Sequence, residues 1–336
     1  SFAIGFAKYA EALIPGIDLA IVAAAIMILC FVANLFGIKT AARFQTVMVL
    51  GLLVSLILYI VFGMAHIEDY SPYTAIPTVM PNGFGGFFAA AFLLRLSLIG
   101  SEFISEFGDE MENPGKMIPL VMGLSLAIVV VLYIFIAVVA TGVLPLEEIA
   151  GKNLAATAKI LFSPTVYVAF IGGGIMISLV TSLNAIFGWC TRGLYRATED
   201  GWLPPKLAAV NRHGVPYIYL TVFFLIGITP ILTGMTLDYV AILGNAVGAI
   251  FGLFPVFALF NLAKRNPEAY RNAPFRLPLW ATKSFPILAV IIYGYGIYSS
   301  WGFIGNTGWL LLLGYSTVVL IYIQLRTPYV AQLKEH

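Results

Sequence analysis

The sequence predicts an all-α integral membrane protein that crosses the bilayer nine times. Hydrophobic residues make up 60% of the 336 residues and charged residues only 10%, whereas soluble domains carry about 25% charged residues. Apolar runs of about 20 residues recur along the chain, and each is long enough to cross a hydrocarbon core of about 30 Å. Neither the alternating pattern of strands nor a low-complexity linker interrupts these runs.

The nine spans differ in what connects them. Residues 1–17 are expected to be the end of another helix and a turn at Pro15-Gly16, and residues 65–83 an irregular outer loop. Residues 145–164 predict a short amphipathic helix between two prolines, which either rests on the outer surface or moves as an outer gate. The spans are expected at residues 18–36, 44–64, 84–106, 118–142, 165–190, 216–233, 238–262, 285–304 and 307–325.

Basic residues predict the orientation of the spans. If the first span runs from outside to inside, most of the 18 Lys and Arg residues fall in inner loops or at the C-terminus, as the positive-inside rule requires. We therefore expect an outer N-terminus and a cytoplasmic C-terminus in a plasma membrane. Because no export signal precedes an outer N-terminus, we also expect that the chain lacks its beginning, with an odd number of spans upstream.

Composition gives no sign of a cofactor or a nucleic-acid partner. Cys30 and Cys190 both lie in apolar segments, so neither a disulfide nor a metal site is expected, and the net charge is only +2. No nucleophile, metal ligand set or acid pair converges at membrane depth, which excludes a membrane enzyme. The expected partners are the lipid bilayer and a small-molecule substrate, and the sequence does not predict an oligomeric state.

The third span, residues 84–106, contains polar residues that a lipid-facing helix does not need. Arg95, Ser97, Gly100 and Glu102 interrupt its apolar run. Charge at membrane depth costs about 2.5–3.5 kcal/mol, and loosened backbone is tolerated only where it faces protein or a watery cavity. We therefore predict a discontinuous helix of the kind that forms binding sites in secondary transporters.

Four passages, all on the predicted inner face or directly before it, carry a resemblance to a known family. They are Gly100 to Glu102 followed by Glu110-Met-Glu-Asn-Pro-Gly-Lys-Met-Ile-Pro119; Arg192-Gly-Leu-Tyr-Arg-Ala-Thr-Glu-Asp-Gly-Trp-Leu-Pro204; Asn34-Leu-Phe-Gly-Ile-Lys39; and Arg271-Asn-Ala-Pro-Phe-Arg-Leu-Pro278. Together they resemble the amino acid–polyamine–organocation (APC) superfamily of permeases.

The resemblance implies an inverted five-plus-five repeat, as in LeuT-like transporters, with the first and sixth helices broken. The nine spans match the fourth to twelfth of the family's usual twelve, so the first three are lacking. Residues 1–64 then correspond to the remainder of the first repeat, 84–262 to the second repeat, and 285–325 to two extra C-terminal spans, all in one transmembrane domain of residues 1–336.

The resemblance also implies a substrate site at the break in the third span. Family members hold the two charged ends of an amino acid largely by backbone groups at their first and sixth spans, and the first of these, which supplies half of the site, is among the spans expected to be lacking here. Leu96 stands where some relatives place an aromatic gate, which puts that lid in doubt. The alternative is that Gly100 only permits close helix packing. The residues carried over are Leu96, Ser97, Leu98, Ile99, Gly100 and Ser101.

Glu102 and Arg95 are the proton or gate residues that this site suggests. Glu102 matches an acid found in some relatives, where it can take up a proton or pair with a cationic substrate. Arg95 lies seven residues earlier, on the same face of a continuous helix, so the alternative is a structural Arg95–Glu102 pair. Its positive charge disfavours a cationic substrate.

Thr181 and Ser182 are an expected ion site of lower weight. Hydroxyls at this place ligate sodium in transporters of related fold, and other relatives use a lysine in their fifth span. No lysine lies between Lys39 and Lys116, so the lysine route is unsupported. The alternative is that both hydroxyls bond to their own helix backbone.

Charged residues near the predicted inner face suggest gating loops. The acidic group of Glu106, Asp109, Glu110 and Glu112 is expected to be a solvated gate loop rather than a metal site. Arg192, Arg196 and Asp200 suggest either inner-face salt bridges or ordinary positive-inside anchoring.

The predicted function is secondary transport of amino acids by alternating access, with neutral amino acids as the expected substrates and proton coupling as the favoured mechanism. Three alternatives stay open: an exchanger, a carrier of polyamines or cationic amino acids, and a transport-inactive partner or sensor subunit.

Overall fold

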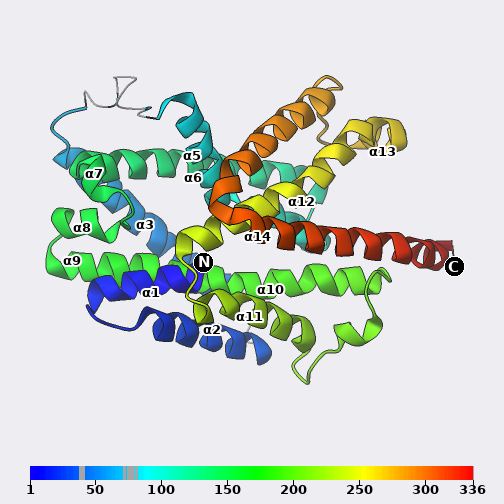
Figure 1. Ribbon diagram of the computed structural model, residues 1–336, viewed down its shortest axis with the longest axis horizontal. Coiled ribbons are helices and arrows are strands. Elements are labelled where there is room, and N and C mark those ends of the chain that lie inside the picture. Colours follow the sequence, from blue (N-terminus) through cyan, green and yellow to red (C-terminus); the bar gives the residue numbers. More distant parts are fainter. Residues whose placement is uncertain (38–41, 71–72, 74–79, 81, 336) are drawn as a thin grey trace. The chain divides into compact units, whose positions relative to one another are not determined.

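The computed structural model describes residues 1–37, 42–70, 73, 80 and 82–335. Within the helices, only the backbone is described for residues 42–45, 96, 106, 107, 109, 110, 334 and 335. The described residues form helices, turns and irregular segments, without a strand among them. The all-α class expected from the sequence is therefore confirmed for this part of the chain (Figure 1).

The helices follow the predicted apolar runs, with two differences. The expected third span ends its α-helix early, at Leu98, and residues 145–164 form two short helices instead of one. The last two predicted spans are separated by a kink at the non-helical Gly305 (φ 72°), which lies between their expected bounds. The elements are α1 (Phe2–Leu13), α2 (Leu19–Leu35), α3 (Ala42–His66), α5 (Gly83–Leu98), the 3₁₀ helix η2 (Ser101–Glu110), α6 (Pro114–Val143), α7 (Leu146–Ile149), α8 (Ala155–Leu161), α9 (Pro164–Val168), the π-helix η3 (Ala169–Met176), α10 (Ile177–Glu199), the 3₁₀ helix η4 (Pro205–Ala208), α11 (Tyr217–Leu232), α12 (Leu237–Arg265), α13 (Pro267–Asn272) and α14 (Ala281–Glu335).

Several of these helices are long and apolar enough to cross a membrane. Among the described residues, five segments satisfy both criteria: Thr46–His66, Pro114–Val143, Pro164–Glu199, Leu237–Arg265 and Ala281–Leu333. The shorter apolar helices are Leu19–Leu35, Gly83–Arg95 and Tyr217–Leu232. Each predicted span thus contains helix, whereas nine crossings and the inverted repeat stay predictions.

The chain forms two compact units. Unit 1 comprises residues 1–71, 131–237 and 322–336, and unit 2 comprises residues 72–130 and 238–321. Both α6 and α14 contribute residues to each unit.

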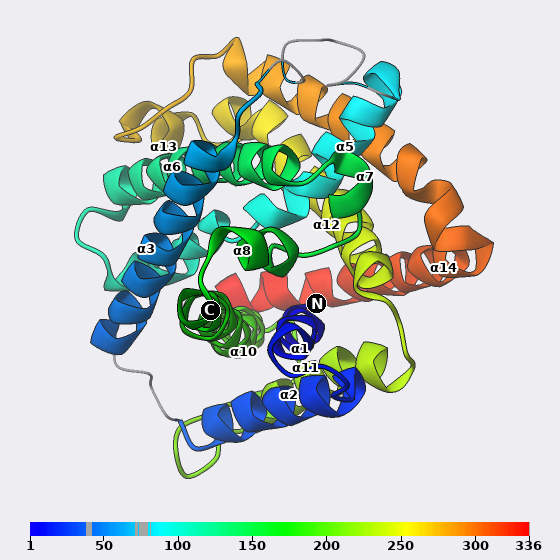
Figure 2. The ribbon, with the colours of Figure 1, turned by 90° about the vertical axis from the view of Figure 1, so that its left-hand side faces the viewer.

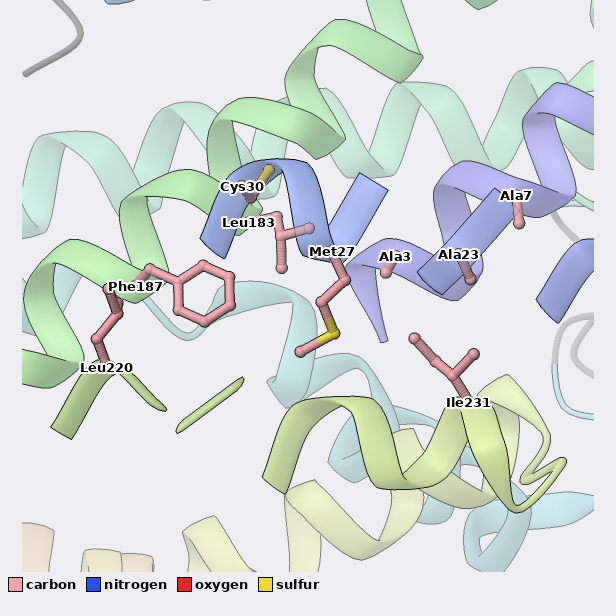
Figure 3. Close-up of a cluster of buried hydrophobic side chains, with 9 residues drawn as sticks. All are labelled: Ala3, Ala7, Ala23, Met27, Cys30, Leu183, Phe187, Leu220 and Ile231. Carbon is pink, nitrogen blue, oxygen red and sulfur yellow. The ribbon is translucent and has the colours of Figure 1, made fainter. Parts of the chain in front are cut away.

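The first core of unit 1 lies where α1, α2, α10 and α11 pack together. In two views α2 runs beside α1 and α11 (Figures 1 and 2). On α1, α2 and α10 the buried residues recur three or four positions apart, and on α11 they are eleven positions, or about three turns, apart; each spacing places them on one face of the helix. Figure 3 shows them converging: Ala3, Ala7, Ala23, Met27, Cys30, Leu183, Phe187, Leu220 and Ile231.

A second core of unit 1 holds helix α8 against α3. The Tyr59 and Phe170 rings stack at 5.5 Å, and Phe162 packs against Phe170 at 5.2 Å. The hydroxyls of Tyr59 and Thr157 lie 2.6 Å apart and share a buried hydrogen bond. The segment of residues 145–164, expected to contain an amphipathic helix, thus packs on α3 through the buried residues of α8.

The end of α14 contacts the loop that follows α10, also within unit 1. The hydroxyl of Tyr322 donates to the carbonyl of Trp202 (2.7 Å), and Nε of Arg326 donates to the carbonyl of Gly201 (2.9 Å). Val330, in the same part of α14, is buried. Two backbone carbonyls beyond the last turn of α10 therefore find donors from residues far along the chain.

Unit 2 contains α5, α12 and the first part of α14. Ala246 of α12 is buried with Ile304 and Trp309 of α14, and the Trp301 and Trp309 rings stack at 4.8 Å. The Tyr295 hydroxyl donates to the carbonyl of Gly85 at 2.8 Å. These contacts tie α14 to both α12 and α5.

Candidate functional site

The predicted discontinuous helix is present at Ile99–Gly100. Helix α5 ends at Leu98 because Ile99 is extended (φ −69°, ψ 137°) and Gly100 has φ 137°. Residues other than glycine rarely adopt the φ value of Gly100, so glycine at this position permits the change of direction. The chain then continues as the 3₁₀ helix η2, and the break expected from the sequence is confirmed as a feature of the backbone.

Backbone groups of opposite polarity flank this break. The last four carbonyls of an α-helix lack partners within the helix, and for α5 these belong to residues 95–98. They form the negative end of the helix dipole, and the amides that begin the next helix form a positive end. Of the predicted site residues, Ser97 and Gly100 are exposed, and Leu98, Ile99 and Ser101 are half-buried. The side chain of Leu96 lies outside the described atoms.

Glu102 contacts the break directly. Its Oε2 atom accepts a hydrogen bond from the backbone amide of Gly100 at 2.8 Å. This amide would otherwise continue the helix by donating to the carbonyl of Leu96. The amide of Phe103 donates instead to the Gly100 carbonyl at 3.2 Å, which starts the 3₁₀ winding. The carboxylate thus stabilises the turn that separates the two helical pieces.

Arg95 is held by a neighbouring helix of unit 2. Its Nη1 atom donates to Oδ1 of Asn245 on α12 at 2.8 Å, and its guanidinium lies 4.9 Å from the centre of the Tyr293 ring. Among the described side chains, no ion pair joins Arg95 to Glu102: one contacts Asn245 and the other contacts Gly100. The structure therefore does not contain the Arg95–Glu102 pair that was the alternative interpretation.

The hydroxyl of Thr181 bonds to its own helix. It donates to the carbonyl of Ser178 at 2.8 Å, and the Ser178 hydroxyl donates to the carbonyl of Ile175 at 2.7 Å. Ser182 is half-buried on the same helix. The helix-backbone alternative describes Thr181 in this structure, although its oxygen lone pairs can still accept.

The loops predicted to lie on the inner face show local contacts of ordinary strength. Arg196 pairs with Glu199 at 3.3 Å, three residues along an exposed helix face, an arrangement that typically contributes less than about 1 kcal/mol. Asn113 has φ 55° and Pro114 begins α6, so this pair separates η2 from the next helix. Of the acidic group, Glu112 is exposed, and the side chains of Glu106, Asp109 and Glu110 lie outside the described atoms.

Asn245 is the contact residue that sequence reasoning missed. It is 1% exposed, and its Nδ2 atom donates to the backbone carbonyl of Phe92 on α5. An amide inside an apolar span is itself a signal, because such side chains usually hydrogen-bond to another helix. The sequence does not identify the side-chain partner of Asn245, which is Arg95, 150 positions away.

A cavity of about 250 Å³ lies elsewhere, in unit 1, between α1, α2, α10 and α11. Its walls are apolar, formed among others by Met27, Phe187, Phe223 and Ile231. It offers no set of convergent charged or polar side chains, so it does not suit a zwitterion. Arg95, Glu102 and the backbone groups of the break belong to unit 2 instead.

Comparison with known proteins places the chain among membrane permeases. A family model described as "Amino acid permease" matches residues 1–323. The chain is similar to the branched-chain amino acid permease BcaP of Bacillus subtilis, with 28% identity over 85% of this chain and 58% of the relative. It is 28% identical to the serine/threonine exchanger SteT of B. subtilis, over 79% of this chain and 60% of the relative.

A third relative differs in what it carries. The methylthioribose transporter of B. subtilis is 25% identical to the chain, over 95% of this chain and 71% of the relative. The chain therefore spans about six-tenths of the length of the two amino acid carriers that it matches and somewhat more of the third.

Proposed function

Because the chain belongs to the amino acid permease family, we propose that the protein moves amino acids across the membrane by alternating access. The family match covers residues 1–323, and the long apolar helices of the chain fit an integral membrane protein. The family consists of carriers, and the chain is not that of an enzyme. The observation that supports this function is the break of α5 at Ile99–Gly100.

The break suits a zwitterion. Carbonyls at the end of α5 attract an ammonium group, and amides at the start of η2 attract a carboxylate. Neither interaction needs a full countercharge, so a molecule with both charges is favoured over one with a single charge. In this proposal Leu96, Ser97, Leu98, Ile99, Gly100 and Ser101 line the substrate site.

We expect the substrate side chain to be neutral. Leu98 and Ile99 offer apolar surface beside the break, and Arg95, three residues before Leu98, disfavours a second positive charge. The names of BcaP and SteT specify branched-chain amino acids and serine or threonine, all neutral. Methylthioribose, in the name of the third relative, is also uncharged.

Proton coupling through Glu102 is the mechanism that we favour. The ionised carboxylate accepts from the Gly100 amide, and protonation weakens such a charge-assisted hydrogen bond. Proton uptake would therefore loosen the turn that shapes the substrate site. Sodium binding at Thr181 and Ser182 is the rival route, and exchange without an ion is the third.

The proposed topology follows the sequence. We propose nine spans, with an inverted repeat formed from residues 1–64 and 84–262 and two further spans in residues 285–325. An odd number of spans puts the two ends on opposite sides, and the basic residues favour an outer N-terminus and a cytoplasmic C-terminus in the plasma membrane. Introduced cysteines at Lys8 and Arg326 test this, because only Lys8→Cys should react with an impermeant reagent on intact cells.

Uptake into liposomes tests the function. The protein is reconstituted, and entry of labelled leucine, alanine, arginine and putrescine is measured with an inward proton gradient, then with a sodium gradient at clamped pH. We expect saturable uptake of leucine or alanine that responds to the proton gradient. Faster entry of arginine or putrescine would contradict the substrate class, and accumulation driven by sodium alone would contradict the coupling. No amino acid uptake under any condition would favour a transport-inactive partner subunit.

A further inference from the structure

Asn245 of α12 bonds to two different parts of α5. Its side-chain oxygen accepts from Nη1 of Arg95 at 2.8 Å, and its side-chain nitrogen donates to the carbonyl of Phe92. The Asn245 backbone carbonyl is also 3.5 Å from the same Nη1 atom. Because Asn245 is 1% exposed, water does not replace either partner, and losing one would leave a buried polar group unsatisfied.

The face of α12 that carries Asn245 is shaped for the guanidinium of Arg95. Asn245, Gly248 and Gly252 are spaced three and seven positions apart and so lie on one face of the helix. A Cβ atom at Gly248 would lie 3.4 Å from Nη1 of Arg95, and one at Gly252 would lie 3.2 Å from the Tyr293 ring. The absence of a side chain at Gly252 leaves room for the Tyr293 ring beside Arg95, whereas a Cβ atom at Gly248 would make an ordinary contact with the guanidinium.

Helix α14 holds α5 at further points on the same side. The Tyr295 hydroxyl donates to the carbonyl of Gly85, and the ring of Phe92 lies so close to Gly296 that a Cβ atom there would be about 2 Å from it. Contacts at Gly85, Phe92 and Arg95 therefore run along α5 from its beginning to its last turn. The last of them is the only one among these with a charged group.

We infer that Asn245 and Arg95 are positioning residues, which fix the last turn of α5 so that its carbonyls face the substrate. Arg95 precedes Ile99 by four residues, a rise of about 6 Å in an α-helix. Because only about one helical turn separates Arg95 from the break, a shift of the Arg95 side chain would also shift the carbonyls at the break. Neither side chain needs to touch the substrate for this role. The inference rests on the proposed transport of amino acids.

A purely structural role for Arg95 and Asn245 predicts a different result for the double variant. If Asn245 only satisfied the buried charge of Arg95, replacing both residues by apolar ones of similar size would restore normal behaviour, because buried polar pairs are often replaceable in this way. If the pair positions α5, the double replacement should fold and still bind substrate poorly. The double variant Arg95→Met/Asn245→Leu separates the two roles.

The test compares leucine uptake by proteoliposomes for the wild-type protein, Asn245→Leu, Arg95→Met and the double variant. We expect each single variant to raise KM about tenfold, the effect of a lost hydrogen bond to a charged group. Vmax per folded molecule should stay within about twofold. The double variant should be no worse than either single variant, since both remove the same contact. Asn261→Leu changes an exposed amide of α12 and serves as the matched control with unchanged KM.

Other outcomes overturn the inference. A normal KM in the double variant would assign the pair a structural role only. A raised KM in Arg95→Met with a normal KM in Asn245→Leu would mean that Arg95 binds the substrate itself. If Asn245→Leu gives no folded protein, Asn245→Ala decides by the same KM criterion, because it also removes both the acceptor for Arg95 and the donor to Phe92. Failure of the proposed function is distinguishable, since the wild-type protein would then transport no amino acid.

Discussion

Two helical segments of this chain depart from α-helical geometry in opposite ways. At Gly100 the segment formed by α5 and η2 is interrupted, and the chain changes direction at φ 137°. At Gly172–Gly174 the segment formed by α9, η3 and α10 widens into a π-helix and continues to Glu199 without interruption. Both sites depend on glycine.

The reason for glycine differs between the two sites. A Cβ atom added to Gly100 would meet nothing within 4 Å, so its backbone angle and not its surroundings requires glycine. A Cβ atom at Gly174 would lie 2.6 Å from Oγ of Ser55 on α3, while its φ stays outside the positive range. One glycine permits a conformation, and the other permits a close approach between two helices.

The largest expected effect is that of Gly100→Ala. Holding an L-residue at this φ costs about 1–3 kcal/mol, so the turn should relax and separate the groups that bind the substrate. We expect leucine uptake per folded molecule to fall at least about tenfold. Gly100→Leu should lose a similar amount, because space around the residue is open. Normal uptake by Gly100→Ala, measured in proteoliposomes, would show that the φ value does not matter for transport.

Gly174→Ala should have an intermediate effect, on stability. The added methyl overlaps Ser55, and such overpacking costs about 1–3 kcal/mol, so the midpoint of thermal unfolding should fall. Ser55→Gly in the same molecule should restore the midpoint, since it removes both atoms that the methyl meets. The neighbouring Gly173→Ala is the matched control, because nothing lies within 4 Å of its added Cβ. Equal losses in the two alanine variants would refute the close-approach explanation.

Glu102→Gln should have the smallest effect on the structure and a specific one on transport. The glutamine oxygen can still accept from the Gly100 amide, so the yield of folded protein should stay the same. The side chain no longer titrates, so the pH dependence of leucine uptake should flatten if Glu102 carries the proton. Glu102→Leu, which cannot accept, should also disturb the turn. An unchanged pH profile in Glu102→Gln would remove Glu102 from the coupling mechanism.

Much of the fold follows from residue patterns along the chain. Apolar runs of membrane length predict the helices, and the polar residues between Arg95 and Glu102 predict the break, since a continuous lipid-facing helix has no place for them. The π-helix was not predicted, because Gly172–Gly174 in an apolar run is equally consistent with close packing of an α-helix. The early end of α5 at Leu98 depends on the Glu102–Gly100 hydrogen bond, which a hydropathy pattern does not contain.

The partner of Arg95 marks where sequence reasoning stops. The spacing of Arg95 and Glu102 suggests a pair on one helix face, but this assumes the continuous helix that the same residues argue against. Once the helix breaks, the two side chains no longer share a face, and Arg95 finds Asn245 instead. Contacts between helices 150 residues apart depend on packing, and one sequence alone does not specify them.

The contact between the end of α14 and the loop after α10 has a consequence for biosynthesis. The Gly201 carbonyl receives its donor from Arg326, 125 residues later, and translation at about 5–20 residues per second delivers that donor roughly 6–25 s after the acceptor. During this interval the Gly201 and Trp202 carbonyls depend on water, so the chain must keep this loop at an aqueous surface until its final helix is made. A stop codon that removes only the last fifteen residues of this sequence would thus leave the Gly201 and Trp202 carbonyls without these donors, so the folding defect would lie far along the chain from the truncation.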